Sequence, residues 1–317
     1  MPILKGLTAA LAWLGRRGTR ALALSVFIGL SLPQLAAYVK PFLGVLVFVM
    51  LLSSYLRTDP GAFVRHFKSP GLAGAASAWV MVVTPLLFGA VYTALGLRET
   101  APALYQIMIL QLAIAPITSS PAFAALMGLD VALSLVTLIV SSAISPFSTA
   151  GLSYLFLGSS MLSPVELGLK LFFFFAASGT IAYAIRRVAG QPWIERKKEM
   201  LDGVNVMAAF VFAIAAMDGV PRHFIDDPLW ATGILALVTA VIGVLIGLSL
   251  LVFMRAGINR ALVIGLLAGF RNLGVVMAAI GSTLPDLAWF YFAMVQFPIY
   301  LMPLLLKPMV QRFAEKR

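Results

Sequence analysis

The sequence predicts an all-α polytopic membrane protein with ten transmembrane helices, and three observations support this fold class. The composition is extreme, with 61% hydrophobic and only 11% charged residues and a mean hydropathy of +1.00. The 317 residues contain ten apolar segments, each about long enough to span a bilayer as a helix. Positive charge alternates between the connections of these segments. Such a composition excludes a soluble enzyme and a disordered chain.

The ten segments follow one another with short connections, which leave no room for a soluble domain. They cover roughly residues 21–38, 40–56, 71–97, 102–128, 131–157, 163–185, 200–218, 229–254, 260–282 and 287–309. They lack the two-residue alternation of outer-membrane barrel strands, so we expect helices. Residues 3–14 are expected to form an amphipathic lead into an uncleaved first helix. The alternative is a signal peptide, because the run ending at Ala37 loosely resembles a cleavage site.

Lys and Arg residues indicate the orientation in the membrane. With a cytoplasmic N-terminus, 18 of the 23 fall on the cytoplasmic side, 4 fall near the outer side, and Arg271 lies inside a segment. Positive residues accumulate on the cytoplasmic side of membrane proteins. We therefore expect an inner (plasma) membrane protein with both termini in the cytoplasm. The net charge of +11 has the same origin, and the absence of a dense basic run argues against nucleic acid as a partner.

The two halves, residues 1–158 and 159–317, are predicted to be repeats of five helices with inverted topology. The fourth segment of each half carries a polar break, Pro-Ile-Thr-Ser-Ser-Pro at 116–121 and Gly-Phe-Arg-Asn-Leu-Gly at 269–274. Paired broken helices in inverted halves are typical of secondary transporters and of their binding sites. The alternative is that proline and glycine simply kink ordinary helices, as they often do in membranes.

The segment after each break is expected to be interrupted by proline. Pro146 stands in the segment that follows Asp130, and Pro298 stands in the one that follows Asp286. The matching order of break, acidic residue and proline supports the repeat. Gln296 lies just before Pro298, which makes it a further candidate for the substrate site.

The breaks themselves are predicted to bind an anion. Ser119 and Ser120 precede Pro121, an arrangement typical of an N-cap followed by proline in the first helical turn. Asn272 is expected to cap the second half-helix in the same way. A helix N-terminus carries about half a positive charge and free N–H groups, so two such ends at mid-membrane would bind a carboxylate. Thr118, Ser119, Ser120 and Asn272 are therefore candidate substrate-binding residues.

Arg271 is the most informative residue of the sequence. An arginine at the centre of a membrane helix is costly, by about 2.5–3.5 kcal/mol on insertion scales, and is usually functional. Three interpretations compete. Arg271 binds the anionic substrate through its bidentate fork, or it stands in for a bound cation by donating to carbonyl and hydroxyl oxygens of the breaks, or it lines water without a function.

Over nearly its whole length, and at low sequence similarity, the chain resembles the bile acid:sodium symporter family. The resemblance is clearest at residues 116–134 and 269–274. It implies ten helices in two inverted repeats. A core domain would contain helices 3–5 and 8–10, about residues 71–157 and 229–309, with broken helices 4 and 9 crossing. The remaining helices would form a panel domain. The resemblance also implies uptake of bile acids or other organic anions with sodium.

The residues that the family uses for sodium are altered here. The resemblance places Leu267 where the family has glutamate, Pro121 at an asparagine, Arg271 at a glutamine, and about Val80 at another glutamine. Sodium about 6 Å from a guanidinium would be repelled by about 3 kcal/mol at an effective dielectric constant near 20. The sequence therefore argues against sodium coupling and indicates no other cofactor. The remaining candidates for a sodium site are Thr118, Ser134 and Thr137.

The predicted function is secondary transport of a small organic anion, bile acid-like or a carboxylate. Two alternatives stay open: a sodium-coupled symporter with a reduced sodium site, and a non-transporting membrane sensor or assembly subunit. An enzyme is not expected, because the sequence contains no nucleotide-binding motif and no cluster of histidine and acidic residues. The sequence does not specify the substrate, the coupling ion, the direction of transport or the oligomeric state.

Overall fold

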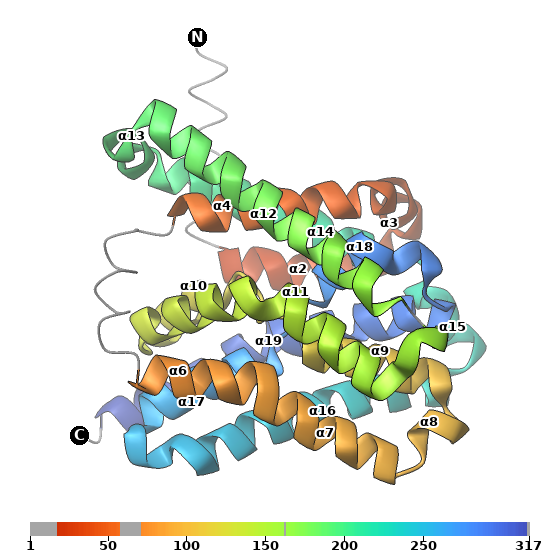
Figure 1. Cartoon of the computed structure of the whole chain (residues 1–317). Helices are drawn as coiled ribbons and strands as arrows, with labels where there is room; N and C mark the ends of the chain where they lie inside the picture. The colour runs from red at the N-terminus through yellow and green to blue at the C-terminus, as the bar shows by residue number, and fades with distance from the viewer. Residues whose placement is uncertain (1–17, 58–70, 162, 316–317) are drawn as a thin grey trace. The chain divides into compact units, whose positions relative to one another are not determined.

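The computed structural model describes residues 18–57, 71–161 and 163–315. Within these ranges the regular elements are helices, and the one strand-like feature is an isolated bridge between two loops (Figure 1). Seven helices are long and apolar enough to cross a membrane, and three shorter apolar helices accompany them. The chain is thus an all-α, membrane-embedded protein. The predicted amphipathic lead at 3–14 lies outside the described residues.

The chain divides into two compact units, each made of two stretches of sequence. The first contains residues 1–59 and 174–232, and the second contains residues 60–173 and 233–317. Helices α12 (Pro164–Ala189) and α16 (Pro228–Phe253) run across the boundaries. Both predicted helix breaks, with Arg271, belong to the second unit.

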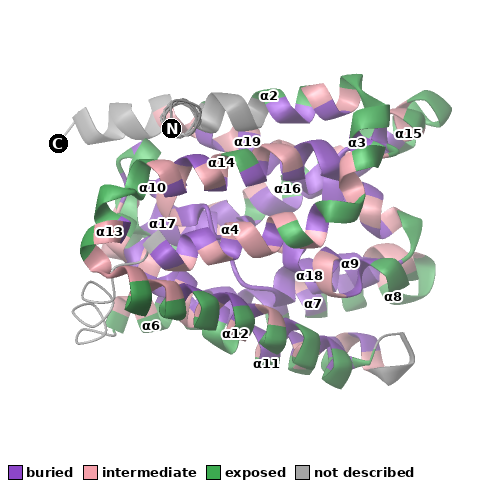
Figure 2. Cartoon of the chain, turned by 90° about the horizontal axis from the view of Figure 1, so that it is seen from above, coloured by how far each residue is buried: buried purple, intermediate pink, exposed green. Residues whose placement is uncertain are grey.

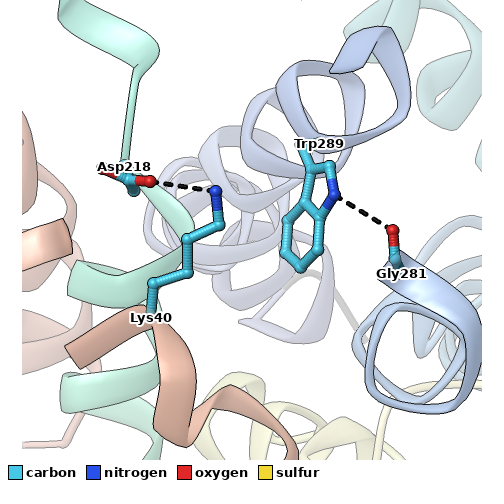
Figure 3. A network of polar contacts seen from close by, with 4 residues as sticks. All are labelled: Lys40, Asp218, Gly281 and Trp289. Carbon is cyan, nitrogen blue, oxygen red and sulfur yellow. Dashed lines mark hydrogen bonds and ion pairs between the residues drawn. The ribbon is translucent and has the colours of Figure 1, made fainter. Parts of the chain in front are cut away.

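The first unit is built around α14. Its described elements are α2 (Gly18–Ser31), α3 (Pro33–Val39), η1 (Lys40–Phe42), α4 (Leu43–Arg57), the later part of α12, α13 (Gln191–Arg196), α14 (Lys198–Ala216) and α15 (Val220–Asp226). α14 packs against α2, α3 and α4. Lys40 in η1 and Asp218 after α14 form an ion pair of 2.9 Å (Figure 3). Arg186 donates to the carbonyl oxygen of Leu56 at 2.8 Å. Polar contacts thus hold the chain just before α4 and the last turn of α4 within the unit.

The predicted boundary between the first two segments, near residue 39, is wrong. α2 already ends at Ser31, and Pro33 opens α3. A proline disfavours helical geometry in the residue before it, and Leu32 accordingly has φ −125° and ψ 70°. The second proline of this region, Pro41, only tightens the chain into the short η1 turn, so that residues 33–56 form one continuous apolar span.

The second unit contains the remaining helices and the candidate site. Its described elements are α6 (Gly71–Ala78), the π-helical turn η2 (Trp79–Val83), α7 (Thr84–Ala94), α8 (Leu97–Thr100), α9 (Pro102–Ala113), α10 (Ser120–Met127), α11 (Val131–Met161), the start of α12, most of α16, η3 (Met254–Ala256), α17 (Ile258–Gly269), α18 (Leu273–Ile280), η4 (Gly281–Thr283) and α19 (Asp286–Glu315). α9 and α17 are buried along most of their lengths, whereas α6 is mostly exposed or half-buried, with Ala76 and Ser77 as its buried residues (Figure 2).

α17 approaches α16 closely because two of its residues are glycines. A Cβ atom added at Gly265 would lie 3.0 Å from the carbonyl oxygen of Ile246, and one at Gly269 would lie 3.1 Å from the side chain of Ile242. Small residues permit such close backbone contact between membrane helices. At the other end of the broken helix, the indole nitrogen of Trp289 donates to the carbonyl oxygen of Gly281 at 3.2 Å (Figure 3).

The predicted interruptions at Pro146 and Pro298 do not occur. α11 runs through Pro146, and α19 runs through Pro298. Membrane helices tolerate an internal proline when neighbouring groups satisfy the freed backbone. α11 instead departs from helical geometry at Gly158, which has φ 71° and ψ −174°. The true breaks of the second unit are those between α9 and α10 and between α17 and α18.

Candidate functional site

The two helix breaks meet and pair with each other through their backbones. Pro116 and Arg271 form an antiparallel bridge. On one side of the bridge the amide of Ile117 donates to the carbonyl oxygen of Phe270 at 2.9 Å, and on the other the amide of Asn272 donates to that of Ala115 at 2.8 Å. The breaks therefore satisfy part of each other's backbone hydrogen-bonding groups. This crossing brings together all four predicted break residues and Arg271.

Two hydroxyl groups of α11 complete the first break. Ser145 accepts a hydrogen bond from the amide of Ala115 at 3.1 Å, and Thr149 donates to the carbonyl oxygen of Ala113 at 2.9 Å. Both side chains are fully buried and lie one turn apart, so they also contact each other at 3.4 Å. The sequence alone does not single out Ser145 as part of the break. Its position beside Pro146 was the one signal that a freed backbone lay nearby.

Arg271 is fully buried and lies at the centre of the crossing. Its Nε donates to the carbonyl oxygen of Ala268 at 2.7 Å, and its Nη1 donates to that of Ile114 at 3.1 Å. Its Nη2 donates to the carbonyl oxygen of Val80 at 2.6 Å and to the hydroxyl of Thr84 at 3.0 Å. A weaker contact of 3.7 Å joins Nη1 to the sulfur of Met81. The guanidinium thus reaches both breaks and the π-helical turn.

The acceptor at Val80 exists because the helix is irregular there. In the π-helical turn η2 the amide of Thr84 donates to the carbonyl oxygen of Trp79, five residues back. The next amide in that pattern would serve Val80, but residue 85 is proline and has no N–H. The carbonyl oxygen of Val80 is therefore left for Arg271 and for the hydroxyl of Thr84, which donates to it at 3.2 Å.

The acceptors around Arg271 are all neutral, and they match the donors in number. A guanidinium has five N–H groups, and the five contacts take one, two and two of them at Nε, Nη1 and Nη2. In this conformation no N–H is left to form a bidentate contact with a substrate. Asp130, the acidic residue that follows the first break, instead forms an ion pair of 3.4 Å with Arg260. The geometry favours the interpretation of Arg271 as a fixed cation.

The predicted N-cap positions are correct, but the capping bonds are not made. Ser119 is the N-cap of α10 and Asn272 is the N-cap of α18, and neither side chain bonds to its own helix. Ser120 instead donates to the carbonyl oxygen of Ile117 at 2.8 Å. Thr118 and Ser119 are buried in the break. Backbone carbonyl groups take part of this role, because the amides of Ser120 and Phe123 in α10 and of Leu273 and Val275 in α18 already donate to them. A ligand would therefore meet the remaining first-turn N–H groups of each helix.

The remaining candidates lie away from the backbone pairing. Gln296 is buried on α19 and donates to the carbonyl oxygen of Phe292 on its own helix at 3.0 Å. Ser134 and Thr137 are buried on α11, about 12–17 Å along the helix from Ser145 at 1.5 Å per residue. The hydroxyl of Thr137 has no hydrogen-bond partner in the described structure. Among the described residues, no group of three or more His, Cys, Asp or Glu side chains could hold a metal ion.

No protein-family model matches the sequence, and no curated protein matches it. The chemistry of the site therefore follows from its own geometry. That geometry combines two uncapped helix N-termini with one buried, permanently charged guanidinium inside an all-α membrane protein.

Proposed function

We propose that the chain is a secondary transporter that moves a small organic anion across the membrane by alternating access, with its substrate site at the crossing of the two broken helices. The observation that carries this proposal is the bridge between Pro116 and Arg271, which brings two uncapped half-helix N-termini together. Discontinuous helices whose N-termini point at an anionic group are a recurring design of transporter sites.

The electrostatics of the crossing select an anion. The N-termini of α10 and α18 each contribute about half a positive charge, and Arg271 adds a full one. The acceptors around Arg271 carry no formal negative charge to compensate it. A carboxylate at the N-termini would therefore bind through N–H groups, Thr118, Ser119 and Asn272, with the guanidinium acting through space.

The same proposal includes the family and the topology. A chain of ten helices in two inverted five-helix repeats, similar to the bile acid:sodium symporters and with both termini in the cytoplasm, accounts for the two breaks and for the charge distribution. The altered residues Leu267 and Arg271 favour transport without sodium. The chain is proposed to have no enzymatic role.

The test is a binding screen on the purified full chain in detergent. Carboxylates, keto acids, sulfonates and bile salts are each compared with a neutral amide or ester of the same size, and the shift in unfolding temperature is measured. The proposal expects stabilisation by at least one class of anion and none by its neutral counterpart. Proteoliposomes then test whether the same anion is exchanged across the membrane. Failure of every anion to bind, or equal uptake by empty liposomes, would overturn the proposal.

A further inference from the structure

We propose that the oxygen atoms around Arg271 form a monovalent cation site, and that the chain fills this site with its own guanidinium group. Four oxygens from three stretches of the chain surround the charge, three of them backbone carbonyls and one the hydroxyl of Thr84, which lies on the same helical span as Val80. Carbonyl and hydroxyl oxygens are the ligands that replace the hydration shell of an alkali cation. The guanidinium of Arg271 is therefore held by the same kinds of ligand that would bind a dissolved alkali cation.

Two of the carbonyl groups lie where helices end. Ala268 is in the last turn of α17, and Ile114 directly follows α9. The C-terminal end of a helix carries about half a negative charge and has carbonyl groups without intrahelical partners. Two such ends therefore favour a cation at the position of the guanidinium. The N-terminal ends of α10 and α18, on the other side of the breaks, favour an anion.

The third carbonyl, that of Val80, is provided by the π-helical irregularity of its helix. Pro85 and the π-helical turn leave the oxygen of Val80 without a backbone donor, and this oxygen makes the shortest of the bonds to Arg271, at 2.6 Å. A helix rarely leaves a buried carbonyl unpaired. The donors that serve this oxygen are the hydroxyl of Thr84 and the guanidinium of Arg271, so the distortion at η2 presents an oxygen to the cation.

A cation site differs from a purely structural role of Arg271. A structural role requires the arginine side chain itself, whereas a cation site requires a cation of suitable size and charge, whether or not that cation is attached to the chain. The site itself does not depend on the proposed function. Only its consequence, transport without a dissolved coupling ion, rests on that proposal.

The experiment removes the attached cation and offers a dissolved one. Arg271→Ala is prepared as the full chain in detergent, and its unfolding temperature is measured while guanidinium chloride is added from 0 to 50 mM, with choline chloride keeping the ionic strength constant. The expected result is a lowered unfolding temperature that guanidinium restores, by at least half and with a saturable dose dependence. Sodium chloride is tested in the same way, and a smaller specific rescue is expected.

Arg260→Ala is the matched control, because Arg260 is 56% exposed and its described ion pair is with Asp130 at the protein surface. Guanidinium should not stabilise this variant. If Arg271→Ala does not accumulate, Arg271→Lys is compared with Arg271→Gln in choline buffer, and the charged variant should be the more stable. Absence of a saturable rescue of a folded Arg271→Ala, or a Gln variant at least as stable as the Lys variant, would overturn the inference. Both measurements are independent of anion binding and uptake. A failure of the proposed transport function would therefore leave the result of this test unchanged.

Discussion

Arg271 and Val80 lie 191 positions apart in the sequence, and a hydrogen bond of 2.6 Å joins the guanidinium of the first to the carbonyl oxygen of the second. The bond connects the break in the later half of the chain to the π-helical turn in the earlier half. It forms because Pro85 cannot donate to that carbonyl. The environment of the buried charge is therefore determined as much by Pro85 in α7 as by the break that contains Arg271.

The hydroxyl of Thr84 is expected to contribute to the stability of the crossing. Thr84→Val keeps the shape of the side chain and removes one acceptor of Arg271, so the free energy of unfolding should fall by about 1.5–3 kcal/mol, as for a hydrogen bond to a charged group. Denaturation in mixed micelles, followed by tryptophan fluorescence, measures the change. Thr239→Val is the control, because Thr239 is exposed and donates to the carbonyl oxygen of Leu235 on its own helix. Equal losses in the two variants would contradict the prediction.

The hydroxyl of Ser145 is expected to hold the first break in place. Ser145→Ala leaves the buried amide of Ala115 without its acceptor, which should cost about 1–3 kcal/mol of stability. Because the break is part of the proposed anion site, affinity for the anion found in the screen should fall as well. Ser148→Ala, three residues along the same helix, removes a hydroxyl that bonds only to the carbonyl oxygen of Ser145 and should change neither quantity appreciably. An unaltered Ser145→Ala variant would show that α11 does not support the break.

A negative charge at the N-cap of α18 should abolish anion binding without unfolding the protein. Asp and Ser are both good N-cap residues, so Asn272→Asp and Asn272→Ser should fold equally well. A carboxylate about 5 Å from the bound anion is repelled by about 3 kcal/mol at an effective dielectric constant near 20, which exceeds a tenfold loss of affinity. Calorimetric titration of both variants gives the comparison. If Asn272→Asp binds as tightly as Asn272→Ser, the anion does not lie at this helix end.

Uptake by the wild-type chain is expected to be independent of sodium. In the proposed site Arg271 takes the position of a coupling cation, and the residual candidates Thr118, Ser134 and Thr137 include no carboxylate. Proteoliposome uptake in sodium should match uptake in potassium or choline at equal ionic strength. A tenfold or larger gain in affinity that is specific to sodium would mean that a dissolved ion binds elsewhere in the chain.

Both termini are expected on the cytoplasmic side. The charge distribution predicts it, because 18 of the 23 Lys and Arg residues then lie inside. A fluorescent protein and an alkaline phosphatase, each fused after Arg317, report opposite sides of the membrane. Phosphatase activity at this end would overturn the predicted number of spans.

The sequence located the breaks but not the partners of the charge. Polar residues such as Ser119 and Asn272 interrupt apolar segments, so both breaks could be identified from the residue types alone. The acceptors of Arg271 are mainly backbone carbonyl groups, and a carbonyl leaves no trace in the residue type. Val80 and Ile114 are ordinary apolar residues, 191 and 157 positions away from the arginine. Their role arises from local helix geometry and tertiary contact, which no residue pattern encodes.

The boundary error near residue 39 has a related origin. Pro33 and Pro41 look alike in the sequence, and only the surrounding packing decides which of them ends a helix and which is absorbed into a short turn. Pro146 and Pro298 likewise pass inside long helices, whereas Pro116 and Pro121 accompany a real break. In an apolar chain the consequence of a proline depends on whether a hydroxyl or a second backbone is close enough to satisfy the freed groups.

A cation that is covalently attached cannot leave the carrier, and this changes the energetics of a transport cycle. A dissolved ion performs work when it dissociates on the side of lower concentration, whereas in the proposed transport cycle Arg271 would return with the protein on every turnover. With a monovalent anion bound the crossing has no net charge, and without it the crossing carries one positive charge. Membrane voltage, worth about 2.3 kcal/mol per elementary charge per 100 mV, would therefore act on the reorientation of the empty protein in the proposed cycle. The rate of exchange of one anion for another would be the same at any voltage, whereas the net flux of the anion would change with the voltage.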